Sequence, residues 1–358
     1  MCDMVINKYD GVQIVGIASA ASSRWQSLEE AAVCCGVEEE FNVDKFKKNT
    51  GVGGRYLAGD YQTTSDFCYG AAEALLQRYG VDRKEIGVLV FVSQMPDYDQ
   101  PATACVLHKR LGLSQGCMAF DINQGCSGFV YGLNAVSALL QSSNCRYALM
   151  LCGDTSAKNK FRGRRENRDS HSTLLLFGDG GTATLLEKKE NGSLLFTSCT
   201  DGEGFDAIMM SEHTWRHPWS SRPHFLDDVR VFNFSISKAP EMLQSYMEYM
   251  HTTPQDYDKL VLHQANIFIM KTVTKRAGFP PEKMLSSIDE FANTSSASIP
   301  NTLVKEYGQN DSTDPLRFLC CGFGVGLSWA AVELNLSPSQ ILPLVHTDEW
   351  FDDGLPEE

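Results

Sequence analysis

Cys126 lies in a glycine-flanked turn that has the features of a nucleophile site. It follows the strand-like run 118–123 and sits in the segment Gly125-Cys126-Ser127-Gly128. The apolar residues from Phe129 to Leu140 recur at helical spacing, so we expect Cys126 at the N-terminus of a helix. There, unpaired N–H groups and a partial positive charge favour a thiolate and could bind the oxyanion of a thioester. A cysteine that only packs in the core is the alternative interpretation.

Three later segments could supply partners for such a thiolate. His263 ends the apolar run 259–262 and opens a helix-like stretch, whose first turn can hold an imidazole in its neutral form. Asn293 lies in a turn of small polar residues before another helix, where a helix cap is the ordinary role. Val325 lies in the glycine loop 321–329, which could present backbone N–H groups or could simply close a tight hairpin. Each segment alone is weak evidence for a catalytic site.

The composition is that of an acidic globular protein. The chain has 358 residues, enough for two domains, with 43% hydrophobic residues and a net charge of −14. This charge disfavours nucleic acid binding. The first residues show no apolar core of signal-peptide length, and no apolar run approaches the roughly 18 residues that would span a membrane, so we expect neither a signal peptide nor a membrane span. We therefore expect a cytoplasmic protein. Its 12 cysteines include no Cys-x-x-Cys pair, so we expect mostly buried thiols and no metal site.

Strand-like and helix-like segments alternate along the chain, which is typical of an α/β protein with a mainly parallel sheet covered on both faces. The expected strands are 12–18, 86–93, 118–123, 147–152, 182–186, 194–199, 259–263, 318–321 and 328–334, and the expected helices are 65–79, 102–111, 128–141, 239–250, 266–277 and 298–307. We divide the chain into an N-terminal half 1–190, a C-terminal half 191–336 and an acidic tail 337–358, which we expect to be an appendage. Cys126 and His263 are the corresponding reactive residues of the two halves, which would meet at a central site.

Taken together, the four motifs resemble those of the ketoacyl-ACP synthase III family of the thiolase superfamily. They follow one another as Gly-Cys-Ser-Gly, His-Gln-Ala-Asn, Asn-Thr-Ser-Ser-Ala-Ser and Gly-Phe-Gly-Val-Gly-Leu-Ser-Trp, and residues 49–52 and 176–180 extend the resemblance to roughly residues 12–335. The resemblance implies a thiolase-like five-layered α/β fold with two similar halves, each a mixed sheet flanked by helices. It also implies a homodimer and no metal or redox cofactor, with substrates carried on the phosphopantetheine of an acyl carrier protein or on coenzyme A.

The same resemblance implies a role for each motif residue. Cys126 would take up the acyl group of a primer, an acyl-CoA or acyl-ACP, with the N–H groups of Cys126 and Val325 binding the oxyanion. His263 and Asn293 would bind the carbonyl of a malonyl thioester, most simply malonyl-ACP. Loss of carbon dioxide would leave the carbon that attacks the acyl group. The product would be a 3-oxoacyl thioester, made for fatty acids, for specialised secondary metabolites or for surface glycans.

The sequence departs from housekeeping members of the family where they grip coenzyme A. Lys45 and Asn49 stand in the places of a Trp and an Arg, and Phe268 stands where a basic residue is usual. We therefore expect either a primer delivered by an acyl carrier protein or a role in a specialised pathway. The residues that could contact the substrate or an acidic carrier are Asn266, Phe268, Lys271, Lys275, Arg276, Arg164 and Arg165. For the basic residues among them, an ordinary solvated surface is the alternative.

Two other functions stay open on the sequence alone. An acyltransferase of the same fold would pass the acyl group from Cys126 to an oxygen or nitrogen nucleophile without condensation. A non-catalytic partner subunit of a synthase would be expected to lack part of the set Cys126, His263 and Asn293, and this chain has all three. A redox or metal-binding cysteine protein is disfavoured by the cysteine spacing.

Overall fold

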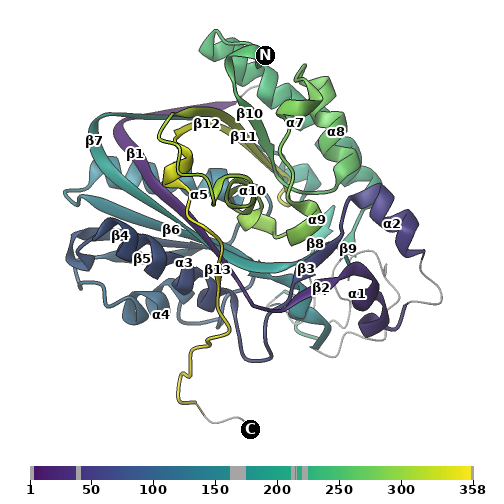
Figure 1. The fold of residues 1–358 in the computed structure, drawn as a ribbon, viewed down its shortest axis with the longest axis horizontal. Helices are drawn as coiled ribbons and strands as arrows, with labels where there is room; N and C mark the ends of the chain where they lie inside the picture. The colour runs from purple at the N-terminus through teal and green to yellow at the C-terminus, as the bar shows by residue number, and fades with distance from the viewer. Residues whose placement is uncertain are drawn as a thin grey trace.

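Two long strands run through both halves of the molecule and join them into one curved sheet (Figure 1). The computed structural model describes residues 4–37, 42–161, 175–210, 214, 216–219 and 225–355. In this part of the chain, β1 (Val5–Ala21) pairs antiparallel with β7 (Asp179–Thr200). Residues 12–20 of β1 pair with the first part of β7, and residues 5–10 pair with its last part. Each of the two strands therefore contributes to both halves.

The N-terminal half has the strand order β5-β4-β6-β7-β1. The strands β4 (Ile86–Val92), β5 (Met118–Ile122) and β6 (Tyr147–Thr155) are parallel to one another. Both faces of this sheet are covered, which accounts for the continuous apolar runs of β4 and β6. The outer face packs against α3 (Thr64–Tyr79) and α4 (Thr103–Arg110), and the inner face packs against α5 (Gly128–Ser142).

The C-terminal half repeats this arrangement with the strand order β10-β11-β12-β7-β1. Its strands are β10 (Lys259–Leu262), β11 (Leu316–Gly324) and β12 (Ser328–Leu336). Helices α7 (Asp228–Met250) and α8 (Ile267–Arg276) cover the outer side, and α10 (Ser298–Tyr307) covers the inner side. Helix α7 begins eleven residues before the expected start at residue 239.

Helices α5 and α10 lie between the two halves of the sheet and form the middle of five layers (Figure 1). Their apolar faces share one buried core, in which Phe129 and Val136 of α5 and Ile299 and Leu303 of α10 are at most 1% exposed. Two further buried clusters lie beneath the outer helices, one in each half. The layered α/β arrangement implied by the motifs is therefore present in the structure.

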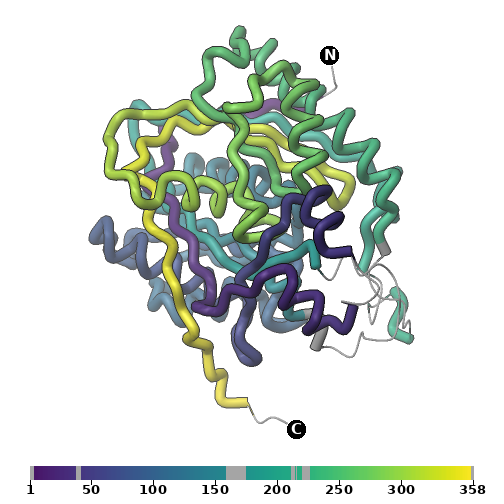
Figure 2. The backbone as a smooth tube through the Cα atoms, turned by 45° about the vertical axis from the view of Figure 1, so that its right-hand side comes forward, coloured from purple at the N-terminus to yellow at the C-terminus, as the bar shows by residue number. Residues whose placement is uncertain are grey.

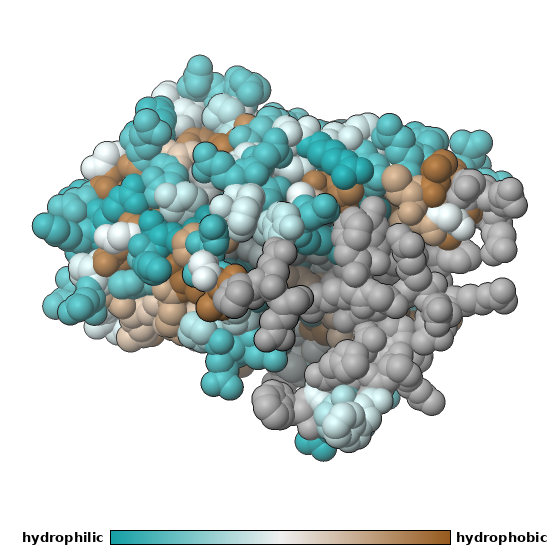
Figure 3. All heavy atoms as spheres, turned by 90° about the horizontal axis from the view of Figure 1, so that it is seen from below, coloured by the Kyte–Doolittle hydropathy of each residue, from teal (hydrophilic) through white to brown (hydrophobic). Residues whose placement is uncertain are grey.

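The remaining elements are short. Among the residues that the structure describes, the other helices and strands are β2 (Trp25–Ser27), α1 (Leu28–Cys35), α2 (Val43–Thr50), β3 (Gly54–Tyr56), β8 (Ile208–Met209), β9 (Phe225–Leu226), α9 (Ile288–Phe291) and β13 (Val345–His346). Short 3-10 turns occur at Arg83–Glu85, Ser156–Phe161, Gly202–Gly204, Pro254–Asp256, Pro281–Lys283, Ser295–Ala297 and Pro338–Gln340. On the face seen in Figure 3, apolar side chains form small groups between hydrophilic ones. None of the helices within the described ranges has the length and apolar character needed to span a membrane.

The tail beyond residue 336 is packed on the N-terminal half, which corrects our expectation of an appendage. Ile341 and Leu342 are buried, and β13 pairs parallel with the end of β1. Figure 2 shows this last segment running beside the N-terminal strand. Phe351 then contacts α3 and α4, because its N–H donates to Asp66 and its ring lies 4.9 Å from the Arg110 guanidinium. The tail thus packs along the N-terminal half from β1 to α3 and α4.

The proposed division at residue 190 falls between the two parts of β7. This division does not describe the first strand completely, because residues 5–10 pair with the last part of β7 and so belong to the sheet of the C-terminal half. The division itself stays a prediction.

Candidate active site

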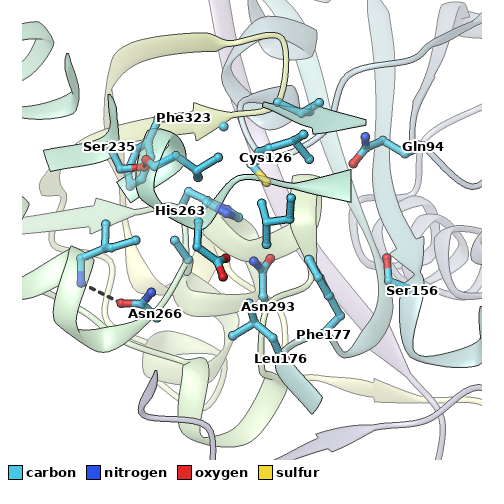
Figure 4. A pocket seen from close by; sticks show the side chains of 18 of the residues that line it. Gln94, Cys126, Ser156, Leu176, Phe177, Ser235, His263, Asn266, Asn293 and Phe323 are labelled. Carbon is cyan, nitrogen blue, oxygen red and sulfur yellow. Dashed lines mark hydrogen bonds between the residues drawn. The ribbon is translucent and has the colours of Figure 1, made fainter. Parts of the chain in front are cut away.

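A cavity of about 880 Å3 lies where the two halves meet, and its wall brings together Cys126, His263 and Asn293. Residues 94–95, 123 and 156–157 line it from the N-terminal half, while residues of α7, α8 and the 323–325 loop line it from the C-terminal half. Figure 4 shows the His263 ring and the Asn293 amide pointing toward Cys126. The three residues proposed from the motifs therefore share one cavity.

Cys126 is held by a close approach between two glycine-rich segments. It lies in the turn between β5 and α5, two residues before Gly128 begins the helix. The loop after β11 packs directly against it, and the Val325 N–H forms a hydrogen bond with the thiol. Both approaches need small residues, because a Cβ at Gly125 would lie 2.5 Å from Val325 Cγ1 and one at Gly324 would lie 3.0 Å from Cys126 Sγ.

The surroundings of Cys126 favour the thiol over the thiolate, which differs from the expected thiolate. Burial raises the pKa of Cys126 to about 12, and the negative charge of the nearby Asp154 acts in the same direction. The hydrogen bond from the Val325 N–H lowers this pKa but does not outweigh burial.

His263 is a neutral imidazole fixed in place at the end of β10. It is 1% exposed, and its backbone N–H donates to the Cys321 carbonyl at 2.9 Å. The ring Nδ1 is 2.8 Å from Ser298 Oγ, and the ring meets Phe323 edge-on with centroids 5.7 Å apart. Burial lowers the pKa of His263 to about 3, so the ring stays uncharged at neutral pH.

Two hydrogen bonds fix the orientation of Asn293 and leave the Nδ2 group of its amide available. Its Oδ1 accepts a hydrogen bond from the Ser295 N–H at 2.9 Å, and its backbone N–H donates to the Leu176 carbonyl at 2.9 Å. Ala292 and Ser295 on either side have φ values of 55° and 52°, which non-glycine residues adopt rarely. Because Oδ1 is engaged, the Nδ2 group is the part of the amide that remains to bind a ligand.

The structure revises which residues correspond between the two halves. Strands β4 and β6 are parallel neighbours, as are β10 and β11, and a parallel bridge between Leu260 and Met284 occupies the place that β5 has beside β4. Cys126, before α5, therefore corresponds to Asn293, before α10. His263, after β10, corresponds to the Ser93–Gln94 segment after β4 and not to Cys126, because both His263 and that segment follow equivalent strands.

The residues proposed for substrate or carrier contact have different positions. Asn266 lines the cavity, but its Oδ1 caps α8 by accepting from the Ile269 N–H at 2.8 Å, as Figure 4 shows. Phe268 lines the cavity, is 60% exposed and stacks on Phe232 with centroids 5.8 Å apart. Lys271 and Lys275 are exposed on α8, outside the cavity wall.

Of the other basic residues, the described Arg276 does not line the cavity wall. Arg276 donates to the Ile236 carbonyl of α7 at 2.7 Å, which indicates a structural role. Arg164 and Arg165 lie outside the described residues. Lys45 and Asn49 are exposed on α2.

The part of the cavity wall near α7 and α8 is apolar. The sequence patterns did not predict that these residues line the cavity. Ile208, Met209, Met210, Leu226, Val229, Val231 and Phe232 all contribute side chains there. Among the lining residues that the structure describes, Asp228 is the one with a formal charge, and none is Lys or Arg. Within the same part of the chain, no group of three His, Cys, Asp or Glu residues is placed to hold a metal ion.

Comparison with known proteins assigns the family. The family model of 3-oxoacyl-[acyl-carrier-protein] synthase III matches residues 120–202, and the model of its C-terminal part matches residues 247–336. The β-ketoacyl-ACP synthase III of Staphylococcus saprophyticus is 32% identical over 289 residues, which are 80% of this chain and 88% of that protein. The chain belongs to the 3-oxoacyl-ACP synthase III family. The same enzyme of Geobacillus kaustophilus is 31% identical over 291 residues, covering 81% of this chain and 88% of that protein.

Solved structures of 3-oxoacyl-ACP synthases have the same fold. The enzyme from Burkholderia xenovorans superposes with a TM-score of 0.88 at 31% identity, covering 97% of this chain and 100% of the other. The synthase III from Pseudomonas aeruginosa gives a TM-score of 0.81 at 29% identity, covering 91% and 98%. The family and the thiolase-like fold implied by the motifs are therefore confirmed.

Proposed function

We propose that this synthase III family member is a condensing transferase that loads a primer acyl group on Cys126 and joins it to a malonyl unit. The observation that carries the proposal is the meeting of a thiol, a neutral imidazole and a free amide N–H group in one cavity. A decarboxylative condensation needs a nucleophile that holds the acyl group and uncharged donors that stabilise an enolate.

In the first step, Cys126 Sγ attacks the carbonyl carbon of the primer thioester. The new Sγ–C bond forms as the C–S bond to the carrier breaks, and the proton lost by the thiol ends on the departing carrier thiol. In this scheme, the N–H groups of Cys126, just before α5, and of Val325, just after β11, stabilise the negative charge on the carbonyl oxygen.

In the second step, His263 and Asn293 bind the thioester carbonyl of the malonyl unit. If the Ser298 hydroxyl donates to Nδ1, the His263 ring carries its proton on Nε2 and can donate it to the substrate. Carbon dioxide leaves, the resulting enolate carbon attacks the acyl carbon, and the Sγ–C bond breaks. The product is a 3-oxoacyl thioester, and Cys126 regains a proton from solvent. Because decarboxylation drives the bond formation, the scheme requires no resident metal or redox cofactor.

We propose an acyl carrier protein as the donor of the primer as well as of the malonyl unit. The described cavity wall has no cationic side chain for the phosphates of coenzyme A. Lys271 and Lys275 instead lie outside, one turn apart on α8, where an acidic carrier could contact them. Charge reversal at both lysines should raise the KM for acyl-ACP and leave that for acyl-pantetheine unchanged, whereas equal effects on both donors would contradict carrier docking there.

We also propose a homodimer through β5. This strand ends the sheet, so its outer edge has no partner among the described strands, and Met118 is 53% exposed. Exposed edge strands are usually covered in stable proteins. A monomer by light scattering at micromolar concentration would contradict this assembly. The cytoplasmic location stays a prediction.

The release of carbon dioxide separates condensation from simple acyl transfer. Acylated protein given malonyl-ACP should release one carbon dioxide per acyl group consumed. The His263→Ala and Asn293→Ala variants should still become acylated but should lose most of this release. Discharge of the acyl group to an oxygen or nitrogen acceptor without carbon dioxide would favour the same-fold acyltransferase, and failure of the wild type to become acylated would favour the partner subunit.

A further inference from the structure

Three neutral polar side chains line the cavity at the carboxyl ends of three neighbouring strands. Gln94 follows β4, Asn123 follows β5 and Ser156 follows β6, and all three belong to the cavity wall. The three strands are adjacent and parallel, so their carboxyl ends meet at one edge of the sheet. Open parallel sheets commonly bind ligands at this edge. We call Gln94, Asn123 and Ser156 the polar subsite.

The polar subsite adjoins the nucleophile. A Cβ built on Gly125, the residue before Cys126, would lie 2.5 Å from Gln94 Oε1. The Gln94 amide is anchored there because Oε1 accepts from Ser295 Oγ at 3.3 Å, and its backbone N–H donates to the buried Asp154 at 2.8 Å. An acyl group on Cys126 Sγ therefore has the Gln94 amide within reach.

The polar subsite keeps hydrogen-bonding groups that the described residues do not use. With Gln94 Oε1 engaged, its Nε2 group has no partner among them, and the same holds for the Asn123 amide and the Ser156 hydroxyl. Gln94 and Ser156 are half-buried, whereas Asn123 is exposed at the rim of the cavity and can be hydrated. An alkyl chain packed against Gln94 and Ser156 would displace water from their groups and leave them without a partner, which is costly. A ligand with a hydroxyl or carbonyl group would supply that partner.

The opposite end of the cavity has a different character and suits the carrier arm. It is lined by apolar residues of α7 and α8, and its most exposed members are Val229 at 69% and Phe268 at 60%. Figure 4 shows Ser235 and Asn266 on one side of Cys126 and Gln94 and Ser156 on the other. A thioester that enters past Phe268 thus directs its acyl chain beyond Cys126 toward the polar subsite.

We propose that the polar subsite selects a primer whose acyl chain carries a neutral hydrogen-bonding substituent, a hydroxyl or a carbonyl, over a plain alkyl primer. The inference rests on the proposed acylation of Cys126, and it adds no covalent step to it. Sites built to hydrogen-bond a substrate group reject the analogue that lacks it, because their own polar groups are then left unpaired.

The test is a competition between matched synthetic pantetheine thioesters at equal concentration, namely butyryl against 3-hydroxybutyryl and butyryl against 4-hydroxybutyryl. Intact-protein mass spectrometry reads the ratio of the two acyl groups on the protein. At least one hydroxyacyl group should be preferred by about fivefold or more, the effect of one net hydrogen bond. Gln94→Leu and Ser156→Ala should bring this ratio close to one.

Ser235→Ala is the matched control, because Ser235 lines the cavity on the other side of Cys126 and its hydroxyl bonds to the Val231 carbonyl. It should keep the preference. If Gln94→Leu does not fold, Ser156→Ala and Asn123→Ala decide the question. Equal or greater loading of butyryl in the wild type overturns the polar subsite, whereas absence of any acyl group from either thioester overturns the proposed acylation itself.

Discussion

Gly324 and Cys126 lie so close together that a side chain at position 324 would have no room. A Cβ at position 324 would lie 2.5 Å from the Cβ and 3.0 Å from the Sγ of Cys126. Contacts this short force the neighbouring atoms to move. The end of β11 thus brings its backbone against the sulfur of Cys126.

The Gly324→Ala substitution should therefore reduce acylation of Cys126 by about 100-fold or more, because a displacement of about 1 Å at a reaction centre has an effect of this size. Gly202→Ala is the control, since a Cβ at Gly202 meets no atom within 4 Å. The measurement is the initial rate of acyl transfer, with a thermal melt to establish folding. A folded Gly324→Ala protein that acylates at the normal rate would contradict the close approach.

Ser298 should act as a positioning residue for His263, whose Nδ1 it contacts at 2.8 Å. Ser298→Ala frees the imidazole to rotate or change tautomer, so carbon dioxide release from malonyl-ACP should fall by about tenfold or more, while acylation of Cys126 should change little. Ser298→Thr, which keeps the hydroxyl, should restore part of the rate. Equal loss in both half-reactions would indicate general damage to the site instead.

Burial of His263 makes the stability of the protein depend on pH in a defined direction. The pKa of His263 in the folded state is about 3, below its ordinary value of 6.5. As the pH falls below 6.5, the unfolded chain binds a proton at this histidine that the folded chain does not bind. The free energy of unfolding therefore falls by up to ~1.4 kcal/mol per pH unit through this residue.

Asp154 and Asp179 act in the opposite direction, because burial raises the pKa of each to about 6. The effect of His263 is therefore measured as a difference in urea unfolding between the wild type and His263→Asn at pH 7.5, 6.5 and 5.5. The stability of the wild type relative to the variant should decline toward pH 5.5. A difference that does not change with pH would contradict a neutral, buried His263.

The tail should stabilise the N-terminal half without entering the chemistry. The Phe351 ring lies 4.9 Å from the Arg110 guanidinium, which also pairs with the buried Asp66 at 2.9 Å. Phe351→Ala should lower the free energy of unfolding by about 1–2 kcal/mol through loss of this cation–π contact and its packing. Leu355→Ala, at a position 68% exposed, should have little effect. If Phe351→Ala is as stable as the wild type, the tail does not stabilise the N-terminal half through Phe351.

The long elements and the reactive residues could be predicted from the sequence because their signals are local. The helical spacing from Phe129 to Leu140 predicts α5 and its buried face, and the continuous apolar run of β4 predicts a strand buried on both faces. Cys126, His263 and Asn293 stood out because each interrupts such a pattern with a polar or glycine-rich turn.

Other features depended on contacts between distant segments. Helix α1 has a capping box of Ser27 and Glu30, but its eight residues are too few for a clear apolar period. The polar subsite needs the order of β5, β4 and β6 in the sheet, which places Gln94, Asn123 and Ser156 together. The resting state of Cys126 depends on how deeply the two halves bury it, and no local pattern contains that information.

Acyl loading of Cys126 is tested most directly by peptide mass spectrometry of the protein after incubation with acyl-ACP. Trypsin should release residues 111–146, which contain Cys117, Cys126 and Cys145, and fragmentation can assign the acyl mass to one of them. We predict one acyl group per chain, on Cys126, and none in the Cys126→Ala variant. An acyl group on Cys117 or Cys145, or full labelling of Cys126→Ala, would contradict the proposed role of Cys126.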